Sequence, residues 1–302
     1  MSGATKLDAA WCAAHPLPDH GPVTDKNARG RVLLVGGSMF VPGALSLTGE
    51  AVLRAGAGKL QIATVDAAAM HLGVLVPEAA MIGLPTNDDG EIGLSAATKL
   101  HKAARYCDAL LIGPGMVSEL SARALIRGLA EVLGDHQTAI LDAAAISCSR
   151  TLAPLISALQ GRVILTPHHG EMERLTGISA EAIAADPIGC ARSVAELFEA
   201  VVVLKSSETV IADPGGATLL YSSECAGLAT GGSGDVLAGI MAGLAARGAD
   251  PLIAAAWGVW LHGQAGQGAR DRIGPIGFLA RDLIYEIPRL MARLAEVSSR
   301  SV

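Results

Sequence analysis

The chain has 302 residues, of which 23 are basic and 29 acidic, so its formal net charge at pH 7 is −6. An acidic chain with 3% aromatic residues lacks the basic field that nucleic acids and anionic membranes require, and it lacks the stacking platforms of single-strand binders. Five cysteines without CxxC spacing, together with a start that resembles no secretory signal, predict a cytoplasmic protein with reduced thiols.

Short β-branched runs alternate with longer helical runs along most of the chain. Six strands are predicted, at residues 31–35, 60–65, 109–112, 138–141, 162–165 and 201–204. Helices are predicted at residues 44–55, 95–104, 119–132 and 187–200. Most of the strands are apolar on both faces, which is typical of a sheet covered by helices on each side. The pattern therefore predicts an α/β fold with a doubly wound, mostly parallel sheet.

The later part of the chain predicts a small antiparallel hairpin followed by two helices. Residues 209–212 and 218–221 flank an Asp-Pro-Gly-Gly turn. A glycine-rich segment then opens a helix that ends at Arg247 and is capped by Gly248, and Asp250-Pro251 begins the next helix. We predict a single domain over residues 25–295, with a loosely attached lead at residues 1–24 and a polar tail at residues 296–302.

Glycine and polar residues follow five of the predicted strands. Ligands of open α/β sheets bind beyond the carboxyl ends of the strands, so these segments are predicted to form the rim of a site. They are Gly36-Gly37-Ser38, Gly113-Pro114-Gly115, Asp142, Thr166-Pro167-His168-His169-Gly170-Glu171 and Lys205-Ser206-Ser207-Glu208-Thr209.

The run Gly231-Gly232-Ser233-Gly234-Asp235 is the most informative segment of the chain. Glycine permits positive φ angles and close backbone approach, so the N–H groups of such a loop can converge on a phosphate at the positive end of the following helix. Asp235, in the first turn, is expected to be held ionised and aimed outward. The arrangement suits phosphoryl transfer to a hydroxyl. The alternative is an ordinary glycine turn whose aspartate only complements the helix dipole.

Several segments, in order, resemble the ADP-dependent NAD(P)H-hydrate dehydratases of the ribokinase-like superfamily. They are Val35-Gly36-Gly37-Ser38, Ala55-Gly56-Ala57-Gly58, Ile112-Gly113-Pro114-Gly115, Leu165-Thr166-Pro167-His168 with Gly170-Glu171, and the sequence GLATGGSGDVLAG at residues 227–239. The resemblance implies a ribokinase-like fold and a hydro-lyase that repairs nicotinamide nucleotides. The family removes water from the S epimer of hydrated NADH or NADPH and converts ADP to AMP and phosphate. Phosphorylation turns the hydroxyl into a better leaving group.

The resemblance also implies roles for individual residues. Asp235 meets the substrate hydroxyl as general base, and the hydrated dinucleotide is contacted by Ala44, Gly115, His168 and Asp235. The nucleotide is bound by Lys205, Ser206, Ser207, Glu208, Thr209, Gly231, Gly232, Ser233 and Gly234. Glu171 organises Mg²⁺ near the phosphates through water. ADP is the implied co-substrate, the chain is expected to form a homo-oligomer, and a functional link to an NAD(P)H-hydrate epimerase is implied.

Each of these side chains also has a structural interpretation that involves no ligand. Lys205 would be a solvated lysine at a strand end, His168 a turn residue that caps the next helix, and Glu171 a complement to a helix dipole. Ala44 and Gly115 would be small residues that let backbones pack closely. His262, on an apolar helix with two tryptophans, is interpreted as a core or interface residue rather than a ligand.

The chain departs from the family pattern at three places. It has Asp142-Ala143-Ala144 where the family usually has Asp-Ala-Asp, Ser206 where a glycine usually follows the lysine, and Glu224-Cys225-Ala226 where Gly-Asn-Pro is usual. The added charge of Glu224 is expected to weaken ADP binding by like-charge repulsion. Two alternatives stay open: an ATP-dependent kinase of a small hydroxylated metabolite, which the same Gly-Ser-Gly-Asp loop would suit, and a catalytically silent nucleotide-binding paralogue, which the replaced Asp and Asn would suit.

Overall fold

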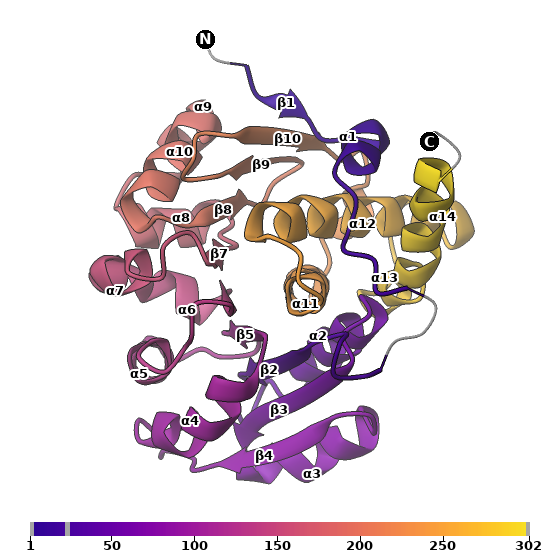
Figure 1. Ribbon diagram of the computed structural model, residues 1–302. Coiled ribbons are helices and arrows are strands. Elements are labelled where there is room, and N and C mark those ends of the chain that lie inside the picture. Colours follow the sequence, from indigo (N-terminus) through magenta and orange to yellow (C-terminus); the bar gives the residue numbers. More distant parts are fainter. Residues whose placement is uncertain (1–2, 22–24, 300–302) are drawn as a thin grey trace.

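The computed structural model describes residues 3–21 and 25–299, with side chains described as far as residue 294. A sheet of ten strands crosses the molecule in the order β1-β10-β9-β8-β7-β6-β5-β2-β3-β4 (Figure 1). The strands are β1 (Thr5–Lys6), β2 (Arg31–Val35), β3 (Lys59–Val65), β4 (Ala80–Leu84), β5 (Ala109–Ile112), β6 (Thr138–Leu141), β7 (Val163–Leu165), β8 (Val201–Leu204), β9 (Glu208–Ala212) and β10 (Thr218–Ser222).

The strand pairing confirms the predicted mixed sheet. The pairs from β4 across to β8 are all parallel, and the β8–β9 and β9–β10 pairs are antiparallel, so the predicted hairpin adds to the same sheet. The central strands β5, β6, β7 and β8 are buried along their whole length, as their uniformly apolar sequences indicate. The edge strands β1 and β4 were not predicted, because one has two residues and the other is only partly buried and contains Gly83.

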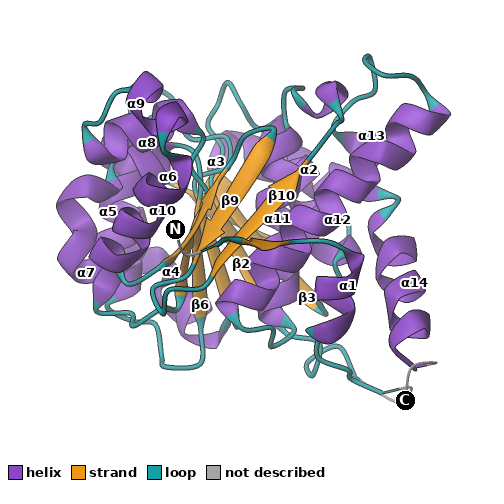
Figure 2. Ribbon diagram, turned by 90° about the horizontal axis from the view of Figure 1, so that it is seen from above, coloured by secondary structure: helices purple, strands orange, loops and turns teal. Residues whose placement is uncertain are grey.

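Helices cover both faces of the sheet, so the core has two layers, one on each face. Figures 1 and 2 place α5, α7 and α10 on one side, and α2, α11 and α12 on the other. The helices are α1 (Ala9–Ala14), α2 (Gly43–Arg54), α3 (Asp66–Leu75), α4 (Ala96–Tyr106), α5 (Glu119–Ala130), α6 (Ala144–Ser147), α7 (Ala153–Ser157), α8 (His169–Thr176), α9 (Ala180–Ala185), α10 (Pro187–Phe198), α11 (Ser233–Ala246), α12 (Pro251–Arg272), α13 (Arg281–Ile284) and α14 (Ile287–Ser299), with 3₁₀ turns at η1 (Ser149–Leu152) and η2 (Ala226–Leu228). In the described ranges, no helix has the length and apolarity needed to cross a membrane.

Two glycines of α11 set the distance and direction of its packing on α2. A Cβ at Gly239 would lie 2.4 Å from the carbonyl oxygen of Thr48, and a Cβ at Gly243 would lie 2.5 Å from that of Val52. Since 239 faces 48 and 243 faces 52, one turn further along each helix, the two helices run in the same direction. Their first turns therefore lie side by side, which brings Ala44 to the level of Asp235.

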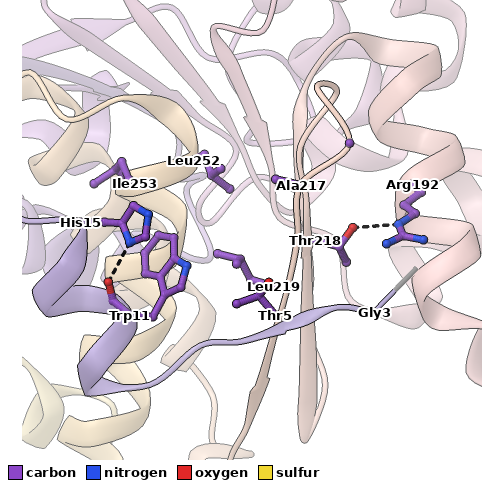
Figure 3. A pocket seen from close by; sticks show the side chains of 11 residues that line it. Gly3, Thr5, Trp11, His15, Arg192, Ala217, Thr218, Leu219, Leu252 and Ile253 are labelled. Atoms are coloured by element: carbon purple, nitrogen blue, oxygen red, sulfur yellow. Dashed lines mark hydrogen bonds between the residues drawn. The ribbon is translucent and has the colours of Figure 1, made fainter. Parts of the chain in front are cut away.

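The N-terminal lead is attached more firmly than its sequence indicates. Strand β1 pairs in parallel with β10, Leu7 and Cys12 are buried, and the indole N–H of Trp257 on α12 donates to the carbonyl oxygen of His15 at 2.8 Å. Figure 3 shows Trp11 and His15, whose rings stack at 4.1 Å, along one wall of a 290 Å³ cavity beside β10. The expected loose attachment is wrong, because a buried leucine and cysteine anchor the segment.

The predicted polar tail begins inside the last helix. Helix α14 continues to Ser299, so the segment predicted as a polar tail from residue 296 is helical up to that point. Residues 300–302 lie outside the described ranges. The domain limits at residues 25 and 295 remain predictions.

Candidate active site

The glycine-rich turn adopts the conformation that its sequence predicts. Gly232 has φ +87° and stands immediately before α11, which begins at Ser233. A Cβ at Gly232 would lie 2.6 Å from the Leu47 side chain on α2, so this position requires glycine both for its positive φ and for its packing. The first N–H groups of α11 have no partner within the helix, so the turn offers donors at the positive end of a helix dipole.

Asp235 lies in the first turn of α11 and is partly buried. Its pKa is raised from 3.8 to about 7, mainly by burial and also by the negative charge of Asp142, while the positive charge of Lys205 acts in the opposite direction. The expectation of a side chain held ionised by the helix dipole is therefore wrong. Loss of water around the carboxylate outweighs the dipole, and the group titrates close to neutral pH.

Lys205 holds two carboxylates together from the end of β8. Its Nζ lies 2.9 Å from Oδ1 of Asp142 and 3.7 Å from Oε2 of Glu171, and Thr166 Oγ1 donates to Asp142 Oδ1 at 2.6 Å. The lysine side chain is 19% exposed, so the interpretation as a solvated lysine is wrong. Burial alone would lower its pKa, but the charges of Asp142 and Glu171 raise it, so the ammonium stays protonated.

His168 and Glu171 form a capping box at the start of α8. Nδ1 of His168 accepts from the N–H groups of Gly170 at 3.0 Å and of Glu171 at 3.2 Å, and Oε2 of Glu171 accepts from the His168 N–H at 2.9 Å. The capping interpretation of His168 is thus confirmed. The same residue also forms a parallel bridge with Lys205, which places it beside the predicted nucleotide-binding segment.

A cavity of about 710 Å³ opens between the glycine turn, the segment after β8 and helix α12. Seven of the predicted site residues line it: His168, Lys205, Ser206, Ser207, Thr209, Ser233 and Gly234. Its apolar wall comes from Tyr221, Leu228, Leu237 and Val259. A polar end beside an apolar wall is the usual composition of a small-molecule site, and the volume is sufficient for a nucleotide.

The other predicted residues lie around this cavity rather than in its wall. Gly231 and Gly232 precede the lining residue Ser233, and the Glu208 carboxylate accepts from Ser222 Oγ at 3.4 Å in the hairpin. Gly115 has φ +70°, and a Cβ there would lie 3.0 Å from the Cβ of Ala44. The structure therefore brings Ala44 and Gly115 into contact with each other, as their packing interpretation expects.

The start of α11 joins these two groups of residues. Gly232 contacts Leu47 on α2, three residues after Ala44, and a Cβ at Gly234 would lie 3.6 Å from Lys205 Nζ. Asp235 follows directly. Asp235 does not line the cavity itself, but it shares the first turn of α11 with the lining residues Ser233 and Gly234.

His262 lines the cavity, a position that the sequence interpretation did not predict. Its Nε2 lies 2.8 Å from Ser233 Oγ and 3.1 Å from the Ser233 carbonyl oxygen. The ring therefore stands at the cavity wall rather than within the apolar core. The apolar sequence around it carried no signal of this contact, and the close approach of Gly263 to the Tyr221 hydroxyl group is visible only in the folded structure.

Two of the departures from the family pattern also fall at the cavity. Glu224 and the buried Cys225 line it, and Ser206 stands at its rim, where its hydroxyl donates to the Glu208 carbonyl oxygen at 2.7 Å. At the third departure, Asp142 makes the ion pair with Lys205, and Ala144 is buried at the start of α6. The effect of Glu224 on ADP binding remains a prediction.

The carboxylates do not form a protein cage for a metal ion. Among the described residues, no group of three or more His, Cys, Asp or Glu side chains is arranged to hold one. Oε2 of Glu171 already accepts from the His168 N–H, and Oε1 lies 3.5 Å from His168 Nε2. Glu171 therefore fits a contact through water, and a direct metal bond would compete with its cap.

Comparison with known proteins agrees with this geometry. A family model described as NAD(P)H-hydrate dehydratase matches residues 32–289. The chain is 46% identical over 290 residues to the ADP-dependent (S)-NAD(P)H-hydrate dehydratase of Xanthomonas campestris pv. campestris, covering 95% of this chain and 96% of that protein. It is also 37% identical to the bifunctional NAD(P)H-hydrate repair enzyme of Moorella thermoacetica, of which it spans about half the length, 54%.

A solved structure extends the similarity to three dimensions. The ADP/ATP-dependent NAD(P)H-hydrate dehydratase of Bacillus subtilis, crystallised with ATP and Mg²⁺, matches with a TM-score of 0.79 and 28% identity. The match covers 97% of this chain and 100% of the other. The doubly wound sheet therefore belongs to a known architecture.

Proposed function

The chain belongs to the NAD(P)H-hydrate dehydratase family, and from this premise we propose that it removes water from the S epimer of hydrated NADH or NADPH while converting ADP to AMP and phosphate. One observation carries the proposal. Lys205, Ser233 and Gly234 line a nucleotide-sized cavity, and Asp235, whose pKa is close to 7, follows them in the first turn of α11. The similarity of the whole chain to the Xanthomonas dehydratase supports the choice of substrate.

ADP would enter the cavity with its phosphates toward the start of α11. The N–H groups of Gly232 and Gly234 and the ammonium of Lys205 would provide donors and positive charge at that end, and the base would face the apolar wall. The Ser233 N–H already donates to the Thr230 carbonyl oxygen at 3.2 Å and would have to leave it to bind a phosphate. Ser206, Ser207 and Thr209 line the same space and offer hydroxyl groups to the ribose and phosphates. The proposed roles of Glu208 and Gly231 are indirect, since both stand beside lining residues.

The hydrated dinucleotide would approach from the side of Ala44 and Gly115, with His168 at the junction. Its ring hydroxyl would then meet Asp235. The hydroxyl oxygen bonds to the β-phosphorus of ADP, the bond from that phosphorus to the bridging oxygen breaks, and AMP leaves. Asp235 accepts the hydroxyl proton, and the donors of the glycine turn stabilise the negative charge on the phosphoryl group being transferred.

The second stage expels the phosphate and restores the ring. The lone pair of the ring nitrogen drives the carbon–oxygen bond apart, phosphate leaves, and a proton is lost from the adjacent ring carbon. In balance, the hydrate loses the elements of one water, and these appear in the AMP and phosphate formed from ADP. A pKa of about 7 suits Asp235 to its proton transfer, because a base is most effective when its pKa is close to the working pH.

Mg²⁺ is proposed to accompany the nucleotide, since the Bacillus relative was crystallised with ATP and Mg²⁺. Such an ion would neutralise phosphate charge and keep much of its water, with Glu171 held near it through that water. The side chains of the described ranges supply no cage of their own for the ion.

We further propose that the chain works as a cytoplasmic homo-oligomer alongside an NAD(P)H-hydrate epimerase. The acidic composition and the absence of a membrane-spanning helix in the described ranges are compatible with the location. The bifunctional relatives are about twice the matched length, which is consistent with a second activity joined to this one.

The test is restoration of NADH absorbance. Purified protein is incubated with hydrated NADH and Mg²⁺, with ADP, with ATP or without nucleotide, and the near-ultraviolet absorbance and AMP are followed. Recovery that requires a nucleotide supports the proposal. ATP turnover on another alcohol, with no recovery, would identify a kinase instead, and calorimetric ADP binding without any turnover would identify a silent paralogue.

A further inference from the structure

His262 reaches from α12 to the first residue of α11. Its Nε2 lies 2.8 Å from Ser233 Oγ and 3.1 Å from the Ser233 carbonyl oxygen. We propose that His262 is a positioning residue for phosphate binding: it donates to Ser233, holds the glycine turn in place and leaves the Ser233 hydroxyl proton directed at a phosphate of the nucleotide. The inference rests on the proposed function, because it adds a determinant of ADP binding to the same cavity.

The contact of Nε2 with the Ser233 carbonyl oxygen favours the tautomer that carries the imidazole proton on Nε2. A carbonyl oxygen can only accept, so the 3.1 Å contact with Ser233 is favourable only if Nε2 is protonated. The same N–H then points at Ser233 Oγ, which acts as an acceptor. The hydroxyl keeps its own proton for another acceptor, and because Ser233 lines the cavity, a nucleotide phosphate is the group it would meet.

The imidazole acts by orientation rather than by charge. Its pKa is lowered to about 4, mainly by burial, which outweighs the opposite effect of the hydrogen bond to Ser233, and the positive charge of Lys205 acts in the same direction as burial. The ring is therefore neutral at physiological pH. A neutral donor cannot attract a phosphate as a cation does, but it can orient a hydroxyl group, which is the arrangement that functional sites use to support their contacts.

The surrounding packing fixes His262 at this place. A Cβ at Gly263 would overlap the Tyr221 hydroxyl, so α12 lies directly against the cavity wall only because that position has no side chain. Gly231 and Gly232, by contrast, give the opposite side of the turn high intrinsic backbone freedom. The contact with His262 therefore restrains the segment that would lose the most entropy on ordering.

The test compares His262→Leu, His262→Gln, Ser233→Ala and the double variant His262→Leu/Ser233→Ala. ADP binding is measured by calorimetry, and kcat and KM are measured with hydrated NADH. We expect His262→Leu and Ser233→Ala each to weaken ADP binding by about 5- to 10-fold, the size expected for a lost hydrogen bond, and the double variant to lose little more. Glutamine can donate from a similar place and should stay within about 3-fold of the wild type.

Histidine ¹⁵N NMR provides a readout that does not depend on turnover. We expect a neutral ring protonated at Nε2 at neutral pH, with a shift of that nitrogen in Ser233→Ala. The proposal would be overturned by unchanged ADP binding in His262→Leu, by losses of affinity that multiply in the double variant, or by a proton on Nδ1. It would also be overturned if His262→Gln kept the urea midpoint of the wild type but bound ADP as poorly as His262→Leu. If the wild type binds ADP but restores no NADH, the proposed function fails, while calorimetry and NMR still decide the role of His262.

Discussion

Replacing Asp235 by asparagine should make the protein more stable at neutral and alkaline pH while removing its activity. The folded-state pKa of about 7 lies well above the ordinary value of 3.8. Between these two values the unfolded chain has released the proton and the folded chain has kept it, so the stability of the wild type falls as pH rises. Below pH 3.8 both states are protonated, and the penalty is absent.

The difference of about 3 pKa units corresponds to roughly 4 kcal/mol at about 1.4 kcal/mol per unit. Asp235 is only partly buried, and solvent screening reduces this figure, so we expect about 2 kcal/mol in practice. Asparagine has the same shape but no charge to desolvate. The stability gained by Asp235→Asn should therefore grow between pH 4 and 7 and level off above pH 7.

The assay is urea unfolding of the wild type and Asp235→Asn from pH 5 to pH 8. The other titrating groups are common to both proteins and cancel in the difference between the two free energies of unfolding. Asp88→Asn, at an exposed site, is the matched control and should give a nearly pH-independent difference. If Asp235→Asn and the wild type lose or gain stability in parallel over this range, the reasoning from burial is refuted.

Three further predictions concern the site and its frame. Asp235→Asn should lower turnover by about 10²-fold or more while leaving ADP affinity nearly intact in calorimetry, and near-normal turnover would remove its role as base. Lys205→Met should weaken ADP binding and lower the free energy of unfolding in urea by about 3 kcal/mol, because Asp142 keeps a buried charge without its partner. The control Lys102→Met, at an exposed position, should change neither ADP binding nor stability. Gly239→Ala should destabilise the protein by about 1 to 3 kcal/mol, because the added methyl group would overlap the Thr48 carbonyl oxygen of α2. The control Gly43→Ala, where the methyl group would face open space, should leave stability unchanged. Equal unfolding midpoints for the two variants would contradict the packing argument.

The strands and their rim were accessible from the sequence because both depend on local chemistry. Uniformly apolar runs such as 109–112 and 201–204 are typical of central strands in a covered sheet, and the structure has β5 and β8 at those residues. Turn and cap residues act within a few positions, so the hairpin and the start of α12 at Asp250-Pro251 were also predicted correctly. Strand β1 was not predicted, because a strand of two residues shows no hydrophobic periodicity.

The electrostatic state of the site depended on the tertiary structure. The pKa of Asp235 follows from the water excluded around it and from Asp142 and Lys205, which lie far away in the sequence. The sequence itself determined the order of the elements, the glycine turn and the segments that meet at the rim, since hydrophobic period and turn chemistry act over neighbouring residues. Only the folded arrangement decided that Lys205 is buried between two carboxylates and that His262 touches Ser233, because burial and hydrogen bonding are properties of groups brought together across the chain.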